Sequence, residues 1–159
     1  MAEQPVSGAP AQFPITVNAQ YIKDFSFENP SAPRSLVNTG KPPNVEVNIN
    51  VEARPVADDT FEVALKVNAS AKTEEFTAFV VDLTYACIIT LSGFSEEQIQ
   101  PVLMIEGPRL LFPFARQIVA EATREGGFPP LLINPIDFAA MYQQNVMQNG
   151  APVDTAGNA

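Results

Sequence analysis

The chain has 159 residues, of which 46% are hydrophobic, enough for roughly one globular domain with its own core. It carries 9 basic and 18 acidic residues, and the resulting net charge of −9 argues against binding to a nucleic acid backbone. There is no histidine and only one cysteine, Cys87, which excludes histidine-dependent nucleophiles, imidazole metal sites, internal disulfides and paired-cysteine zinc or redox sites.

Residues 1–12 and 149–159 are small, polar and without periodicity, which predicts flexible tails on either side of a single domain over 13–148. The first residues lack the basic and apolar regions of a secretory signal. The longest apolar runs fall far short of the ~20 residues that span a bilayer. We therefore expect a cytoplasmic protein that inserts no segment into a membrane.

Alternation of apolar and polar residues predicts four strands in the first two-thirds of the chain. They cover residues 13–28, 45–52, 61–71 and 76–92. In the first strand the alternation blurs at Tyr21 and Ile22, which indicates a bulge. Residues 29–44 are rich in proline, which cannot donate a backbone hydrogen bond to a sheet, and they predict a long crossover connection. Turn-forming residues over 54–59 predict a hairpin between the second and third strands.

The fourth predicted strand is apolar on both faces. Its odd-numbered positions are apolar, and Val80, Ala86 and Ile88 add apolar groups to the opposite face. A strand that is apolar on both sides is normally covered on both sides. Either the crossover connection forms a local pocket over this strand or another subunit covers it, and the pattern leaves both readings open.

The last third of the chain predicts helices, so the fold class is α+β. A short helix over 95–105 is capped by Ser95 and broken by Pro101. A longer helix covers 107–127, with a proline in its first turn and glycines at its end. The final helix is expected to begin at Asn134, which would act as its N-cap.

No group of residues predicts a catalytic, cofactor-binding or metal-binding site. The adjacent carboxylates at 58–59, 74–75 and 96–97 fall in predicted turns or at a helix start, where solvated side chains are expected. No glycine-rich phosphate loop occurs. Cys87 lies on the inward side of a strand without basic neighbours, which favours an inert, packed thiol. We therefore expect a binding protein and not an enzyme.

Two kinds of surface could carry a binding function. The polar side of the predicted sheet has six carboxylates, opposed only by Lys66: Asp24, Glu28, Glu46, Glu52, Glu62 and Asp82. Either this is the ordinary solvated side of a sheet, or it recruits a basic partner in a salt-dependent way. The fourth strand and the helices have more apolar residues than one sheet face needs, which indicates oligomerisation, a ligand groove or both.

Three motifs resemble the SecB family of bacterial protein-export chaperones. They are YIKDFSFENPSAP at 21–33, LFPFAR at 111–116 and GFPPLLINPIDF at 127–138, in the family's order. The resemblance implies a homotetramer, built as a dimer of dimers, whose subunits have a four-stranded antiparallel sheet with two main helices packed on one face. It also implies a function, which is to hold unfolded precursor proteins without ATP and deliver them to the SecA motor ATPase for export.

The resemblance also assigns roles to residues of this chain. The SecA-binding positions on the acidic face match Asp24, Glu28, Val80 and Asp82. The client-binding groove matches Val45, Val47, Ile49, Phe138 and Met141. The subunit interface matches Val81, Leu83 and Tyr85. The tail at 149–159 contains neither lysine nor arginine, so we do not expect it to make the second SecA contact that the family's tail can make.

Two other functions remain open from the residues alone. A small-molecule carrier would enclose the apolar surplus in a cavity and would copurify with a stoichiometric ligand. An enzyme would have to work through carboxylates or through Tyr85 and Tyr142, in a cleft that shifts a carboxyl pKa strongly. The resemblance favours the chaperone over both.

Overall fold

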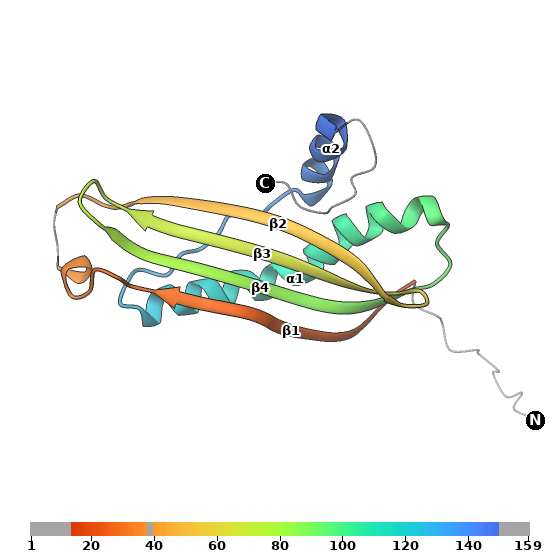
Figure 1. The fold of residues 1–159 in the computed structure, drawn as a ribbon, viewed down its shortest axis with the longest axis horizontal. Coiled ribbons are helices and arrows are strands. Elements are labelled where there is room, and N and C mark those ends of the chain that lie inside the picture. The colour runs from red at the N-terminus through yellow and green to blue at the C-terminus, as the bar shows by residue number, and fades with distance from the viewer. Residues whose placement is uncertain (1–13, 38–39, 150–159) are drawn as a thin grey trace, which may run out of the picture.

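The computed structural model describes residues 14–37 and 40–149, and within them the chain forms four strands and two long helices (Figure 1). The strands are β1 (Ile15–Glu28), β2 (Asn44–Ala57), β3 (Thr60–Lys72) and β4 (Thr77–Leu91). A short 3-10 helix, η1 (Arg34–Leu36), precedes β2, and the helices α1 (Glu96–Glu125) and α2 (Phe138–Asn149) follow the strands. The predicted α+β class is confirmed. Apart from Asn149, the tails expected at 1–12 and 149–159 lie outside the described residues.

The strands form one antiparallel sheet in the order β1-β4-β3-β2. β1 and β2 are therefore the two edges, and the long connection between them runs from one edge to the other at one end of the sheet (Figure 1). The turn predicted over 54–59 was wrong in its extent, because β2 continues through Ala57 and only Asp58 and Asp59 turn. An edge strand tolerates Pro55, since one side of its backbone needs no partner in the sheet.

β1 contains two bulges, one between Val17 and Ala19 and one between Ile22 and Asp24. The second confirms the bulge predicted near Ile22, whereas the first was not predicted. Each inserts one extra residue into β1, and one extra residue moves the following side chains to the other face of the sheet. Tyr21 consequently lies on the opposite face from Val17.

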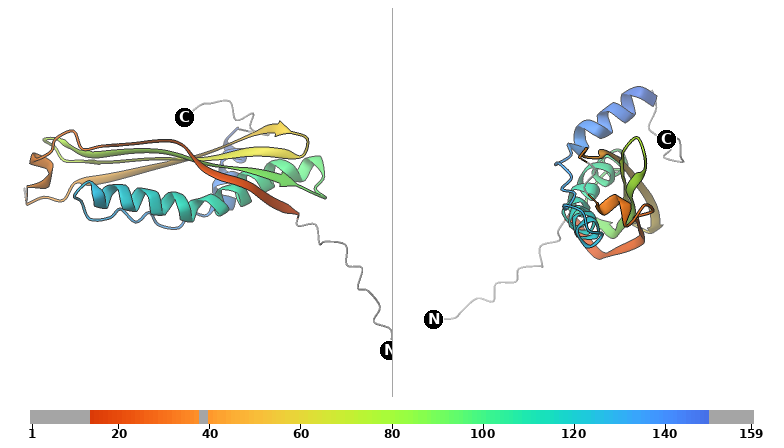
Figure 2. Two further views of the ribbon diagram at one scale, coloured as in Figure 1. Left: turned by 90° about the horizontal axis from the view of Figure 1, so that it is seen from below. Right: turned by 90° about the vertical axis from the view of Figure 1, so that its left-hand side faces the viewer.

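α1 is one continuous helix that runs along one face of the sheet and contacts all four strands (Figure 2). The cap predicted at Ser95 is confirmed, since its backbone amide donates to Oε1 of Gln98 at 3.0 Å. The prediction of two separate helices was wrong, because Pro101 and Pro108 both lie inside α1. Pro108 is fully buried, so its packing offsets the helical hydrogen bond that proline removes.

The core lies between α1 and the face of the sheet that α1 covers. Gly107 allows the helix to approach β3 closely, because a Cβ at this position would lie 2.7 Å from Cγ1 of Val63. The fully buried side chains of this layer include Val63, Leu65, Val67, Val81, Ile89, Leu111 and Val119. Within the described residues, no helix is long and apolar enough to cross a membrane.

α2 packs against α1 through an edge-to-face contact between Phe138 and Phe112, whose ring centroids are 6.0 Å apart. Its predicted start at Asn134 was wrong, because Asp137 is the residue that caps it. The amide of Ala140 donates to Oδ1 of Asp137 at 3.0 Å. The preceding residues stay extended and are held along α1 by Arg116, whose Nε donates to the carbonyl of Ile133 at 3.0 Å.

Candidate functional site

The face of the sheet opposite α1, called the outer face below, carries all six carboxylates that were expected on the polar side. α1 buries the odd-numbered positions of β3 and β4, so the even-numbered positions point outward. The strand pairing places the carboxylates in neighbouring cross-strand rows. They are Asp24 and Glu28 on β1, Glu46 and Glu52 on β2, Glu62 on β3 and Asp82 on β4. The prediction that they share one face is confirmed.

Glu62 is buried at the centre of a polar cluster on this face. Its Oε1 accepts from Nζ of Lys23 at 2.8 Å and from Nε of Arg54 at 2.9 Å, and its Oε2 accepts from the hydroxyl of Tyr21. Burial alone would raise the pKa of Glu62, but these hydrogen bonds outweigh burial and lower the pKa to about 2. Burial and the bond to Glu62 raise the pKa of Tyr21 to about 12. Glu62 is therefore ionised at neutral and mildly acidic pH, and Lys23 and Arg54 compensate its charge.

The prediction that Lys66 alone opposes the acidic side chains was wrong. The bulge in β1 leaves Lys23 free to reach Glu62, and the longer β2 places Arg54 directly opposite Glu62. Lys66 itself pairs with Glu52 at 2.9 Å. These three cations neutralise the part of the outer face that surrounds Glu52 and Glu62.

The rest of the outer face keeps its negative charge. This part, called the acidic half, consists of Asp24, Glu28, Glu46 and Asp82, all of them exposed. None of the four forms an ion pair with any other described residue. Asp82 accepts one hydrogen bond, from Asn68. Unpaired carboxylates on adjacent strands produce a field of one sign, which attracts a basic partner.

The structure brings together the four positions to which the resemblance assigned motor binding. Val80 lies opposite Glu28, in the row next to Asp82, and Asp24 lies one row further along β1. Val80 is half-buried, so it offers an apolar contact among the carboxylates. The arrangement suits a partner surface in which basic side chains surround an apolar one.

The residues expected to form the client groove differ in exposure. Ile49 and Met141 pack against the core cluster that contains Phe138, whereas Val45 and Val47 lie outside this cluster on β2. Val45 and Val47 are 41% and 36% exposed, but Phe138 is only 1% exposed. In this conformation Phe138 holds α2 on α1 and presents no surface to a client. The client-binding role of all five residues stays a prediction, and Phe138 would have to become exposed to take part.

The residues expected at the subunit interface lie in the core of a single chain. Val81, Leu83 and Tyr85 are buried on the side of β4 that α1 covers. The ring of Tyr85 stacks on that of Phe114 in α1, with centroids 6.0 Å apart, and Phe114 is 49% exposed. Their role in a subunit interface stays a prediction. Because α1 covers these side chains, they would influence such an interface through their packing against α1.

The sequence left two explanations for what covers the outer side of β4, the crossover connection or another subunit. The structure shows a third. Tyr21 lies opposite Ala86 and reaches Glu62 on β3, so its side chain crosses β4. Ala86 is fully buried beneath it. β1 of the same chain therefore covers part of the outer side of β4.

Sequence reasoning missed an exposed apolar surface, called the apolar flank below, where β1 meets α1. Its members are Val17, Ile22 and Phe25 on β1 and Leu110 and Phe114 on α1, each more than a third exposed. Ile22 and Phe114 both contact the flank's floor at Tyr85, because Ile22 pairs with Tyr85 and the ring of Phe114 stacks on it. The only signal in the sequence was that the apolar stripe of the helix is wider than one sheet face requires.

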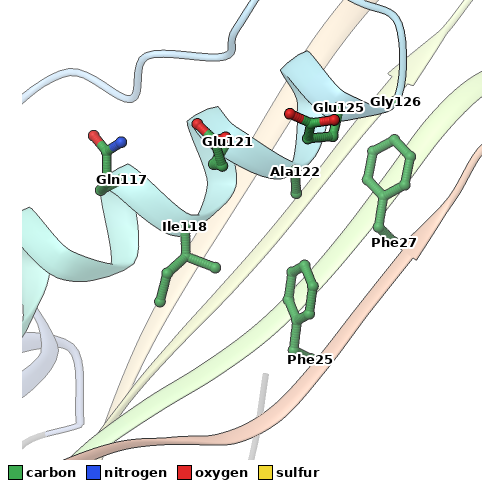
Figure 3. Close-up of a pocket in the computed structure, with 8 residues that line it drawn as sticks. All are labelled: Phe25, Phe27, Gln117, Ile118, Glu121, Ala122, Glu125 and Gly126. Atoms are coloured by element: carbon green, nitrogen blue, oxygen red, sulfur yellow. The ribbon is translucent and has the colours of Figure 1, made fainter.

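A groove of about 580 Å³ continues the apolar flank toward the end of α1 (Figure 3). Phe25 and Phe27 of β1 face Ile118 and Ala122 of α1 across it. Glu121 and Glu125 lie on the helix side of the groove, and Arg124 pairs with both. The groove is thus apolar where strand and helix face each other.

Comparisons with known proteins agree on one family. The model of the SecB family, described as preprotein translocase subunit SecB, matches residues 8–149. The protein-export protein SecB of Azorhizobium caulinodans is 56% identical over 145 residues, which cover 91% of each chain. The protein-export protein SecB of Mesorhizobium japonicum is 52% identical over 141 residues, which cover 89% of this chain and 84% of the relative.

A solved structure shows the same fold. It is that of a SecB-like chaperone of Mycobacterium tuberculosis in complex with a peptide from an antitoxin. The two chains superpose with a TM-score of 0.63 over 77% of this chain and 90% of the other, at 13% sequence identity. At that identity the match supports the fold alone.

Proposed function

The chain belongs to the SecB family of preprotein translocase subunits and is a protein-export chaperone, and we propose that it holds unfolded precursor proteins without ATP and delivers them to the SecA motor ATPase. The proposal places the chain in the cytoplasm, where precursors wait for export, and assigns it no catalytic step. The observation that carries the delivery step is the acidic half of the outer face.

Delivery to SecA would use Asp24, Glu28, Val80 and Asp82. The three carboxylates are exposed and unpaired within the described residues, so no internal ion pair has to break before a basic partner binds. Exposed charges are screened by salt, with a Debye length of about 8 Å at physiological ionic strength. We therefore expect SecA binding to weaken as salt concentration rises.

Client binding would use apolar surface that the fold leaves uncovered. Val45 and Val47 are exposed on β2, an edge strand whose outer backbone groups could pair with an extended client segment. Ile49 and Met141 are partly buried and Phe138 is buried, and these three would widen this surface after a local rearrangement. Several such sites on one assembly would hold a long chain through contacts that are individually weak.

Assembly into a homotetramer, a dimer of dimers, would cover the apolar flank. An exposed apolar surface that continues along a strand and a helix is typical of a subunit contact. Val81, Leu83 and Tyr85 would support this contact from beneath α1, through the stacking of Tyr85 on Phe114. In this arrangement Val81, Leu83 and Tyr85 would hold α1 in place and would not themselves touch the other subunit.

The test of the chaperone activity is light scattering from an aggregating, chemically unfolded precursor, with and without the protein and with no ATP. We expect scattering to be suppressed at stoichiometric amounts. The double variant Val45→Asp, Val47→Asp should suppress scattering less, because a charged edge repels apolar segments. Unchanged scattering with the wild-type protein would contradict the proposal, and it is the result expected of a small-molecule carrier.

A further inference from the structure

Lys23 occupies the position at which β1 changes register. Ile22 is paired with Tyr85 and Asp24 with Thr84, so Lys23 is the extra residue of the bulge and has no partner in the β1–β4 ladder. After this bulge Asp24, Ser26 and Glu28 point to the outer face, and Phe25 and Phe27 point toward α1.

The bulge decides which side chains reach the outer face. In a strand, successive side chains point to opposite faces, and a shift of one residue moves each of them to the other face. A regular ladder continuing from Ile22 would direct Asp24 and Glu28 toward α1. It would also move Phe25 and Phe27 from the apolar groove to the outer face. The two members of the acidic half on β1, Asp24 and Glu28, therefore depend on the bulge at Lys23.

The Glu62 cluster holds the bulge residue and the strand just before it to one fixed point. Nζ of Lys23 lies 2.8 Å from Oε1 of Glu62, and the Tyr21 hydroxyl donates to Oε2 of the same carboxylate. Glu62 belongs to β3, two strands away from β1, and Arg54 of β2 binds it from the other side at 2.9 Å. The cluster thus ties β1 to the centre of the sheet across β4.

We propose that Lys23, Tyr21 and Glu62 are positioning residues, whose contacts fix the register of residues 24–28 and thereby bring Asp24 and Glu28 into the acidic half. They do not themselves contact the motor in this account. The proposal rests on the proposed SecA docking for its functional consequence, but its structural part, the register of β1, does not require a motor.

A simpler reading is that Lys23 and Glu62 form an ordinary surface ion pair, which contributes little to any structure. The outer face contains a matched example in Lys66 and Glu52, whose side chains are 45% and 42% exposed. The side chain of Lys23 is similarly exposed at 44%, but that of Glu62 is only 9% exposed. Lys66 lies within a regular ladder, so only Lys23 joins a buried carboxylate to a bulge.

The experiment compares Lys23→Met with Lys66→Met. Each variant removes one cation and one ion pair from the same face, so the change of net charge is the same in the two. We expect Lys23→Met to weaken SecA binding at least about tenfold, because carboxylates leave the docking surface, and Lys66→Met to leave it unchanged or slightly stronger. Equal changes in the two variants would overturn the proposal.

A second readout follows the register without the motor. Cross-strand NOEs from residues 24–28 to residues 80–84 should match the wild type in Lys66→Met and should be lost or shifted in Lys23→Met. Glu62→Gln, which keeps an acceptor for Tyr21 but loses both ion pairs, should change the same NOEs, whereas Lys23→Arg should preserve them. Wild-type NOEs in Lys23→Met would overturn the proposal. If Lys23→Met changes these NOEs but the wild-type protein does not bind SecA, the proposed docking is wrong and the proposed control of the β1 register still stands.

Discussion

The two faces of β1 differ in chemistry although they belong to one strand. Outward, after the second bulge, it presents Asp24 and Glu28, which are exposed and unpaired within the described residues. Inward it presents Ile22 and Phe25, which are 50% and 41% exposed beside α1. Neither side is closed within one chain, so this edge strand offers two surfaces to partners of opposite character.

The difference indicates how one strand could serve two partners without competition between them. A contact through carboxylates is weakened by salt, whereas a contact through apolar groups is not. Assembly through the apolar flank and docking through the acidic half should therefore respond to different substitutions.

The largest effect is expected from a charge on the apolar flank. Ile22→Asp would place a carboxylate in a subunit contact without a partner, a change that costs several kcal/mol in a buried interface. Native mass spectrometry should show a tetramer for the wild type and smaller species for the variant. Val56→Asp is the control, because Val56 is 46% exposed but lies outside the flank. A wild-type monomer at micromolar concentration, or an intact Ile22→Asp tetramer, would contradict the assembly proposal.

The next effect concerns the acidic half. The double variant Asp24→Lys, Asp82→Lys should reduce SecA affinity by on the order of 100-fold, because two attractive charges become repulsive. Tetramer mass and suppression of client aggregation should not change. Asp58→Lys, Glu74→Lys makes the same change of net charge in two exposed turns and should bind SecA nearly as well as the wild type. Loss of both docking and client holding in the first variant would mean that the outer face is structural.

A smaller effect is expected from acid. The folded pKa of Glu62 is about 2, below its ordinary value of 4.5, so its ionised form stabilises the fold fully above about pH 4.5. This contribution is lost as the pH falls toward 2. Glu62→Gln should lower the free energy of unfolding by roughly 2 kcal/mol at neutral pH and should flatten its dependence on pH below 4.5. Urea unfolding between pH 3 and 7 measures the free energy of unfolding and its dependence on pH. If Glu52→Gln changed these two quantities as much as Glu62→Gln does, the special role of Glu62 would be contradicted.

The smallest effect is expected from the C-terminal tail. Deleting residues 149–159 removes no lysine or arginine and should change SecA affinity by less than about threefold. Surface plasmon resonance with immobilised SecA would measure this difference. A large loss of affinity would show that the tail makes a contact of another chemical kind.

The sequence predicted the strands and the shared acidic face because both depend on a period of two residues. Glu62 and Asp82 alternate with buried or half-buried apolar positions along their strands, and the folded structure keeps this alternation. The motor-binding positions were assigned by resemblance alone, and the strand pairing then placed Val80 beside Glu28.

The predictions from sequence failed, or missed a feature, where contacts between distant parts of the chain determine the local structure. Pro101 and Pro108 predicted a break, but a helix packed along a sheet keeps its course through a buried proline. The role of Lys23 depends on a bulge and on a carboxylate 39 positions along the chain, and no local pattern reports such a pairing. The apolar flank joins β1 to α1, so it exists only once strand and helix lie together.

The most direct test of the account is NMR titration of the isotopically labelled protein with SecA. We expect chemical shift changes at Asp24, Glu28, Val80 and Asp82, and little change at Ile22 or around Glu62. Changes concentrated on the apolar flank, or on the neutralised part of the outer face around Glu52 and Glu62, would contradict the claim that the unpaired carboxylates form the docking surface.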